Sequence, residues 1–228
     1  MFLSSKRICC SDSVSSSRVD HGGEQWLKPS LRKCKCGFSL TPERKSANIQ
    51  LVRRYSCDLK LDINTANRNL VLSEDNREVT RLIEDQPYPD HPERFDFWYQ
   101  ILCRDGLTGR CYWEVEWKGR VYVAATYRGI NRRGNSDDCG LGRNDKSWSL
   151  ICHDGGFTAY IQTAVPPPTS NRVAVYLDWP AGSLSFYSVS SDTLIHLHTF
   201  NTTFTEPLYP GFELWEYESS VCLCEFEG

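Results

Sequence analysis

One stretch limits the possible folds of this chain more than any other, the segment from Arg110 to Trp117. With a period of two, its cysteine, valine and two tryptophans point to one side, and its tyrosine and two glutamates point to the other. Two tryptophans on one side require a substantial core beneath them, because each can bury roughly 150–250 Å². We therefore expect a core β-strand, with Glu114 and Glu116 on its solvent side as surface or turn-pairing groups without a catalytic role.

The composition favours a soluble chain with one large core. A chain of 228 residues fits one all-β sandwich or two small domains, and seven Trp, eleven Tyr and ten Phe can fill a single core. The formal net charge of -3 excludes an overall basic field, so we expect neither nucleic acid nor membrane as a partner. No segment approaches the ~18 apolar residues of a membrane span, and the first residues lack the apolar run of a signal peptide.

The eleven cysteines, an odd number, form no evident disulfide framework. Several fall on inward positions of expected strands, where a free cysteine behaves as a small hydrophobe. Cys34 with Cys36 and Cys222 with Cys224 form Cys-x-Cys pairs, but the Cys-x-x-Cys spacing of many zinc sites is absent. We therefore expect a reduced, cytoplasmic setting and no metal.

Patterns that indicate catalysis are sparse. No Gly-x-Ser-x-Gly elbow marks a hydrolase nucleophile, and no cysteine lies in a nucleophile context that we recognise. The segment 140–143 contains two glycines, yet the helix that a phosphate site requires does not follow it. His196 and His198 share a strand face without an evident third metal ligand. The sequence therefore predicts neither enzymatic activity nor a cofactor.

The first part of the chain predicts an arm rather than a domain. Residues 1–33 are rich in serine and basic residues, which is typical of a poorly ordered linker. An internal repeat follows, in which residues 32–40 and 47–51 align with residues 53–61 and 66–70. We interpret residues 1–52 as an N-terminal arm or linker that contains a degenerate duplicate of the segment after it.

Short strands separated by Gly, Pro and Asp turns fill the rest of the chain. A short strand, an acidic turn and a second strand are expected between residues 71 and 80, and a loop with prolines 87, 89 and 92 should be exposed yet stiff. This pattern, with almost no helical periodicity, predicts an antiparallel β-sandwich. Further strands are expected at Phe97–Leu102, Val121–Tyr127, Trp148–His153, Phe157–Ile161, Arg172–Leu177, Leu184–Val189, Leu194–Phe200 and Val221–Phe226.

Three motifs resemble the signature motifs of the PRY-SPRY, or B30.2, domain in order, spacing and flanks, over about residues 55–227. They are Leu61-Asp62, Trp113-Glu114-Val115-Glu116, and Leu177-Asp178-Trp179 leading into Leu184-Ser185-Phe186-Tyr187. Segments 110–113, 137–139, 144–150 and 209–212 look like the subgroup found at the C-termini of fish NOD-like receptors and tripartite-motif ubiquitin ligases, and stonustoxin-type proteins carry a similar domain. The departures are Ile63 where the family usually has Pro, Trp179 where it often has Tyr, and the duplicated segment before Tyr55.

The resemblance implies an all-β fold, a bent antiparallel sandwich of two sheets like a concanavalin jelly roll. A PRY segment of residues 53–102 and a SPRY segment of residues 103–228 would form one domain. The implied function is non-enzymatic binding of a protein or peptide partner through loops at one end, in innate immune sensing or in substrate selection by ubiquitin ligases. The alternative is a small-ligand sensor of the butyrophilin type, whose basic pocket holds a phosphorylated metabolite. Convergence of His153 and Arg94 on one concave surface would favour that alternative.

The expected partner-binding residues come from segments that resemble the family's recognition loops. Aromatic and arginine side chains dominate interface energies, often with ~2 kcal/mol or more each. On the strand that begins at Trp148, Leu150 and Cys152 should face the core while the residues between and after them face a groove. Arg128, Arg132 and Arg133 precede Asp137 and Asp138 in one loop, which could pair with itself or present its basic tip to an acidic partner. The expected contact residues are Arg94, Phe95, Asp96, Tyr127, Arg132, Arg133, Ile151, His153, Trp215 and Tyr217.

Overall fold

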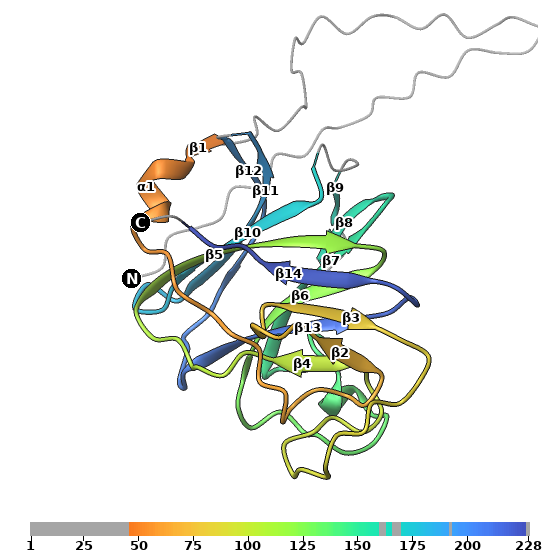
Figure 1. The fold of residues 1–228 in the computed structure, drawn as a ribbon. Helices are drawn as coiled ribbons and strands as arrows, with labels where there is room; N and C mark the ends of the chain where they lie inside the picture. Colours follow the sequence, from red (N-terminus) through yellow and green to blue (C-terminus); the bar gives the residue numbers. More distant parts are fainter. Residues whose placement is uncertain (1–45, 160–162, 166–169, 192, 227–228) are drawn as a thin grey trace, which may run out of the picture. The chain divides into compact units, whose positions relative to one another are not determined.

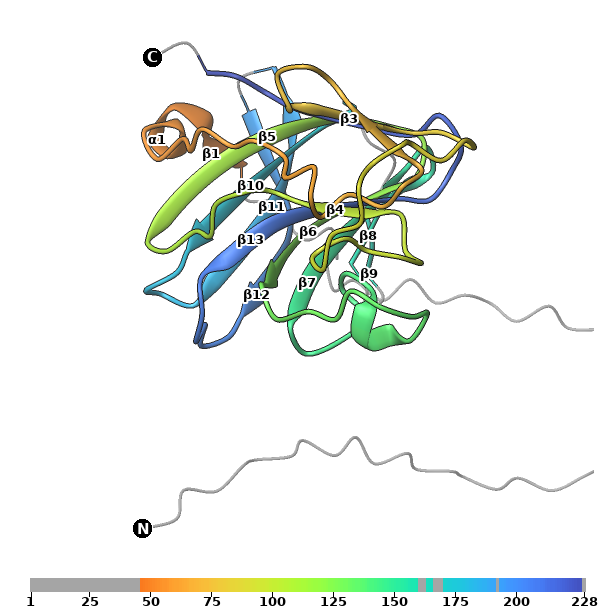
Figure 2. The same ribbon diagram turned by 60° about the horizontal axis from the view of Figure 1, so that its bottom comes forward.

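The structure is a computed structural model that describes residues 46–159, 163–165, 170–191 and 193–226. The described residues belong to one compact unit that is almost entirely β (Figure 1). Predictions for residues 1–45, including the first half of the repeat, lie outside the described residues. Two antiparallel sheets form a sandwich, which confirms the predicted fold class, and Figure 2 shows them as two layers.

The larger sheet has eight strands within the described residues, and the smaller sheet has six. The order in the larger sheet is β1 (Ser46–Asn48), β12 (Thr193–Asn201), β11 (Ser183–Ser190), β10 (Arg172–Asp178), β5 (Arg110–Lys118), β14 (Ser220–Leu223), β3 (Glu78–Arg81) and β2 (Leu70–Leu72). The order in the smaller sheet is β4 (Gln100–Leu102), β13 (Leu208–Leu214), β6 (Val121–Tyr127), β7 (Ser147–His153), β8 (Gly156–Ala159) and β9 (Thr163–Val165). The helical elements are α1 (Ile49–Arg53) and the 3-10 helix η1 (Asp137–Cys139).

Strand β5 lies inside the larger sheet, between β10 and β14. Trp113 and Trp117 are 2% and 5% exposed and point into the main core, as the alternating pattern predicts. Trp113 stands opposite Val175 of β10, and Val123 of β6 belongs to the same core from the other sheet. Each such large apolar side chain stabilises the fold by roughly 1.5–3 kcal/mol. The period-two pattern therefore places β5 correctly.

The other side of β5 corrects the prediction for Glu114. This carboxylate is fully buried, whereas Glu116 keeps 48% of its side chain exposed. Glu114 accepts hydrogen bonds from Tyr112 Oη at 2.7 Å, Arg53 Nε at 3.2 Å and Arg172 Nη1 at 3.2 Å. A buried charge persists only when it is paired and hydrogen-bonded in this way. The prediction was wrong because these two arginines are 61 and 58 residues away in the sequence.

Helix α1 covers this second side of β5. Ile49 is fully buried in a small core with Tyr112, Ala174 and Leu194. Just before it, β1 pairs with β12, with Ser46 opposite Ile195. Residues 46–53 therefore pack on the sandwich, although most of them fall in the expected arm. Their counterpart in the repeat, residues 66–70, forms turns that lead into β2, so these two parts of the repeat differ in structure.

Most of the expected strands are present, and β1, β9 and β13 are strands that the sequence did not predict. Two of the differences have clear reasons. The strand expected from Phe97 begins only at Gln100, because the preceding residues bend outward. Strand β13 was not predicted, because Pro210 and Gly211 interrupt its pattern. The structure accommodates both: the carbonyl of Pro210 accepts a hydrogen bond from Cys103 N at 2.7 Å, and a Cβ on Gly211 would lie 2.7 Å from the Leu102 side chain.

Candidate partner-binding surface

The outer side of the smaller sheet carries a cluster of aromatic side chains. We name Phe97, Trp98, Trp215 and Tyr217 the aromatic patch. The ring centroids of the two tryptophans are 6.3 Å apart, and Phe97 packs edge-on against Trp98 at 5.4 Å. Phe97, Trp215 and Tyr217 are 53%, 40% and 52% exposed, while Trp98 is half-buried. The patch therefore joins the residues before β4 to the residues after β13.

An ion pair supports the patch from below. Arg143 Nη1 lies 2.9 Å from Glu213 Oε2, and Arg143 Nη2 lies 3.1 Å from Glu213 Oε1. The Arg143 guanidinium lies 4.3 Å from the Trp98 ring centroid and 5.0 Å from that of Tyr122, so it also makes cation–π contacts. Tyr122 in turn stacks on Trp215, with centroids 6.4 Å apart. This network holds both tryptophans in place.

Sequence reasoning missed several of these residues. Glu213 and Tyr122 lie at outward positions of β13 and β6. The alternation of side chains along β6, a strand that the sequence predicts, was the signal that could have placed Tyr122 on the outer side. Arg143 carries no such signal, because its carboxylate partner is 70 residues away. Burial raises the pKa of Glu213, and the guanidinium of Arg143 acts in the opposite direction.

A hollow lies beside the patch, and we name it the lateral hollow. Its lining residues are Arg120, Ile151, His153, Thr158 and Glu216. Ile151 and His153 line it together, as expected, while Leu150 and Cys152 of the same strand lie in the main core. Arg120 connects the hollow to the patch, since its guanidinium lies 5.5 Å from the Trp215 ring centroid.

Phe95 does not reach this surface. Its ring is 1% exposed and packs with Leu102, Ala124 and Ile130 in a small core under the loops. The Arg132 guanidinium lies 4.7 Å from its centroid. The expectation that Phe95 contacts a partner directly is therefore corrected, because this packing covers its ring, whereas Phe97, two residues further along the chain, is exposed.

Arg94 and Arg132 are also interior residues, 4% and 8% exposed. Arg94 Nη1 donates to the carbonyls of Ile63 at 2.8 Å and Ala66 at 2.6 Å. Arg132 Nε donates to the carbonyl of Glu93 at 2.9 Å, and its Nη2 lies 3.2 Å from the Glu93 carboxylate. These arginines fasten loops to one another, so the expectation that they contact a partner is corrected as well.

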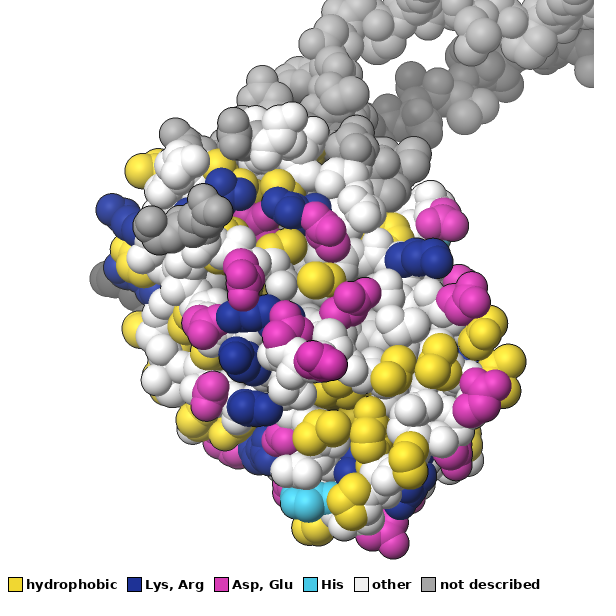
Figure 3. All heavy atoms as spheres, in the orientation of Figure 1, with side chains coloured by type: hydrophobic (Ala, Val, Ile, Leu, Met, Phe, Trp, Pro, Cys, Tyr) yellow, Lys and Arg dark blue, Asp and Glu magenta, His cyan; other side chains and the backbone are white. Residues whose placement is uncertain are grey.

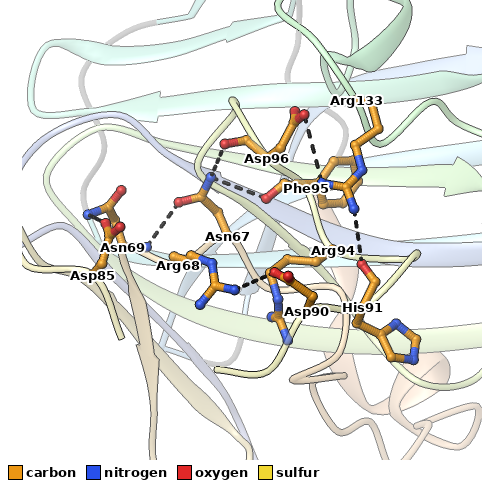
Figure 4. Close-up of a pocket in the computed structure, with 10 residues that line it drawn as sticks. All are labelled: Asn67, Arg68, Asn69, Asp85, Asp90, His91, Arg94, Phe95, Asp96 and Arg133. Atoms are coloured by element: carbon orange, nitrogen blue, oxygen red, sulfur yellow. Dashed lines mark hydrogen bonds and ion pairs between the residues drawn. The ribbon is translucent and has the colours of Figure 1, made fainter. Parts of the chain in front are cut away.

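Asp96 and Arg133 lie at a polar pocket next to the patch, shown in Figure 4. Asp96 Oδ1 accepts a hydrogen bond from Gly134 N at 2.9 Å, and Arg133 Nη1 lies 4.0 Å from Asp96 Oδ2. Arg68 pairs with Asp90 across the same pocket at 2.6 Å. Arg128, Arg132 and Arg133 therefore pair with Glu93 and Asp96 of the proline loop and its continuation, and Arg128 also pairs with Asp62, rather than with Asp137 and Asp138. The pocket's polar groups serve to fix these loops. The ten lining residues are Asn67, Arg68, Asn69, Asp85, Asp90, His91, Arg94, Phe95, Asp96 and Arg133.

Tyr127 lies apart from the patch. Its ring packs edge-on against Trp148 at 5.4 Å, and its hydroxyl accepts a hydrogen bond from Thr205 N at 3.1 Å. Trp148 packs in the same way on Phe204 at 5.2 Å. Of the expected contact residues, Ile151 and His153 thus line one hollow, Arg120 links that hollow to Trp215, and Tyr217 is exposed two residues after Trp215.

The charge on the face drawn in Figure 3 is mixed. Basic and acidic side chains alternate along its left part, and hydrophobic side chains gather toward its lower right. Among the described residues, no three His, Cys, Asp or Glu side chains lie close enough to hold a metal ion. No helix in this part of the chain is long and apolar enough to cross a membrane.

Comparison with known proteins gives two family matches and several relatives. The SPRY-associated domain family, PRY, matches residues 59–107, and the SPRY domain family matches residues 110–226. Neoverrucotoxin subunit alpha of Synanceia verrucosa is 47% identical over 165 residues, which cover 69% of this chain and 24% of that subunit. Tripartite motif-containing protein 16 of Mus musculus is 38% identical over 174 residues, which cover 74% of this chain and 31% of that protein.

Two solved structures share the fold. The stonustoxin structure superposes with a TM-score of 0.71 at 38% identity, covering 78% of this chain and 30% of that one. The TRIM65 PSpry domain superposes with a TM-score of 0.70 at 27% identity, covering 78% of this chain and 94% of that one. SPRY domains are in general non-enzymatic protein-interaction modules. With both segments matched in order on one sandwich, the chain belongs to the SPRY family and carries the joined PRY and SPRY segments of a B30.2 domain.

Proposed function

We propose that this chain binds a protein or peptide partner through the aromatic patch and the lateral hollow. The observation that carries the proposal is the exposure of Phe97 and Trp215, at 53% and 40%, whose rings both pack against Trp98. Tyr217, two residues after Trp215, is 52% exposed. Large contiguous patches of exposed apolar surface mark interaction sites on soluble proteins. Aromatic side chains of this kind supply most of the binding energy at protein interfaces.

The rigidity of the surface supports the same proposal. The Arg143–Glu213 pair holds Trp98 and Trp215, and Arg94 ties the preceding loop to the carbonyls of Ile63 and Ala66. Binding loses less conformational entropy when the contact side chains are already held in position. A patch on such a support can bind with little rearrangement.

We propose further that this recognition serves innate immune sensing or the selection of substrates by ubiquitin ligases, in the cytoplasm. Support comes from the 38% identity to tripartite motif-containing protein 16 and from the resemblance to the C-terminal domains of NOD-like receptors. The chain spans 24% and 31% of the length of the two curated relatives described above. The activity of a whole protein of this kind would require segments outside the matched region.

The alternative function, sensing of a phosphorylated metabolite, has less support. His153 and Arg94 line different hollows and do not converge on one concave surface. The polar pocket around Arg94 also contains Arg68 and Arg133, but Asp85, Asp90 and Asp96 line it as well, and their carboxylates would repel a phosphate group. A concentrated basic pocket is therefore not formed by these residues.

The test compares captured partners. Proximity labelling in cells with the full chain should yield a set of proteins that the double variant Trp215→Ala, Tyr217→Ala loses by roughly tenfold or more, as expected for removal of two aromatic anchors. Leu51→Ala, which truncates a 60% exposed side chain on α1, is the matched control and should keep the set. Calorimetric titration with pyrophosphate should give no binding heat.

An unchanged set of captured proteins, with circular dichroism showing that the double variant is folded, would contradict the proposal. Saturable binding of pyrophosphate that is lost in Arg94→Gln or His153→Asn would favour the metabolite sensor instead.

A further inference from the structure

The arginines around the aromatic patch differ in how their charge is balanced. Arg143 is paired with Glu213 at 2.9 Å. Arg81 and Arg120 also border the patch, and in the described part of the chain no carboxylate lies within ion-pair distance of either one. The direct contacts of these two guanidinium groups are aromatic rings and a backbone carbonyl, and at longer range the Arg120 charge acts on the Glu213 carboxylate.

Both of these arginines contact Trp215. Arg81 donates a hydrogen bond to the carbonyl of Trp215, and its guanidinium lies 3.5 Å from the Tyr99 ring centroid. The Arg120 guanidinium lies 5.5 Å from the Trp215 centroid and makes no side-chain hydrogen bond to any described residue. A guanidinium beside a ring keeps its N–H donors available for a planar acceptor such as a carboxylate. Among Arg81, Arg120 and Arg143, Arg120 is thus the arginine whose side chain makes neither an ion pair nor a hydrogen bond to a described residue.

The lateral hollow supplies a second donor. His153 Nδ1 accepts a hydrogen bond from Gly155 N at 3.1 Å, so the neutral ring carries its proton on Nε2 and donates from there. Arg120 and His153 line the same hollow, with Ile151 as an apolar wall. Glu216 also lines it, and its negative charge opposes a doubly charged anion more than a single carboxylate.

We infer that the partner segment presents one carboxylate to Arg120 and His153 in the lateral hollow, next to an apolar or aromatic side chain that packs on Trp215. The inference rests on the proposed function, because it assigns the chemistry of the partner at the same surface. Trp215 then provides the affinity for the apolar side chain, and Arg120 decides which charge the neighbouring residue carries.

The test uses a library of short random peptides panned against the full chain. The selected peptides should be enriched in Asp or Glu near an aromatic or large aliphatic residue. A synthetic peptide of the selected sequence is then compared with a version in which Gln replaces the acidic residue and a version in which Lys replaces it. The acidic peptide should bind the wild type roughly tenfold or more tightly than the Gln version, the usual range for a hydrogen bond to a charged group.

Three variants separate the inference from the proposed function. Arg120→Glu should weaken binding of the acidic peptide by at least roughly tenfold and reverse the preference in favour of the Lys version. Glu216→Gln, the matched change of opposite sign, should strengthen binding of the acidic peptide. Trp215→Ala should abolish binding of all versions.

The outcomes are distinguishable. If Trp215→Ala abolishes binding while Arg120→Glu leaves the preference for the acidic peptide unchanged, the inference is overturned and the proposed function stands. Selected peptides without acidic enrichment overturn it in the same way. Peptides that bind Trp215→Ala as tightly as the wild type overturn the proposed surface itself, and so does panning that enriches no peptide.

Discussion

Arg143 and Glu213 form a two-point ion pair beneath the aromatic patch, with their nitrogen and oxygen atoms 2.9 Å and 3.1 Å apart. Their side chains are only 8% and 2% exposed. Both charges are therefore removed from water and depend on each other for compensation. The ion pair supports the proposed binding surface only when both residues are present.

Replacing Arg143 alone should destabilise the fold strongly. Arg143→Met leaves the Glu213 carboxylate buried without its partner, and we expect the free energy of unfolding to fall by about 3–5 kcal/mol. The double variant Arg143→Met, Glu213→Met leaves no buried charge and should lose less. Urea unfolding of the three proteins measures both effects, and a double variant as unstable as the single one would contradict the account.

The two glutamates of β5 should respond differently to the same substitution. Glu114→Gln removes a buried charge that pairs with two partly exposed arginines, and we expect a loss of about 1.5–3 kcal/mol, the range for hydrogen bonds to a charged group. Glu116→Gln affects a side chain that is 48% exposed and should cost at most about 1 kcal/mol. Equal effects in urea unfolding would show that Glu114 is not buried.

Helix α1 should prove to be part of the stable fold. Ile49→Ala creates a cavity above Tyr112 and should cost about 2–5 kcal/mol. Leu51→Ala changes a residue that is 60% exposed on the same helix and should lie within about 0.5 kcal/mol of the wild type. Thermal unfolding of both variants measures the difference, and an undisturbed Ile49→Ala would place the helix outside the cooperative unit.

Two phenylalanines that are almost adjacent should separate stability from binding. Phe95→Ala empties a buried site and should cost about 3–5 kcal/mol of stability. Phe97→Ala should leave stability nearly unchanged, because the ring is 53% exposed, but should weaken partner capture. Denaturation curves and proximity labelling of the two variants check this. A Phe97→Ala variant with wild-type capture would remove that residue from the patch.

Protonation of His198 should lower the stability of the fold in mild acid. Burial lowers the pKa of His198 from 6.5, and the charge of His196 acts in the same direction. The unfolded chain therefore binds the proton of His198 more tightly than the folded chain. The stability that neutral His198 contributes to the fold is fully present above pH 6.5 and is lost as the pH falls through the lowered pKa of the folded state. Thermal midpoints between roughly pH 5 and 8 should decline less steeply for His198→Asn than for the wild type. Parallel curves for the two proteins would exclude His198 as a source of the slope.

The strands were predictable because alternation is a local property of extended backbone. Side chains of successive residues point to opposite sides whatever the chain does elsewhere, so β5, β6 and β7 were placed correctly. The same reasoning put Ile151 and His153 on one face, where they line the lateral hollow. Strand β13 was missed because Pro210 and Gly211 remove the local signal, although its neighbours β4 and β6 hold it in the sheet.

The sequence alone determined the class of fold, the central place of β5 and the family resemblance, since each follows from residue order and short-range geometry. The tertiary structure decided which side chains are covered. The alternation of side chains puts Phe95 and Phe97 on one side of the chain and Glu114 and Glu116 on one side, so it does not distinguish the members of either pair. Their burial depends on partners such as Arg172, which is 58 residues from Glu114 and reaches it only after the sheets have formed. Exposure and charge compensation are properties of long-range contacts, and the proposed binding surface consists of the aromatic groups that those contacts leave uncovered.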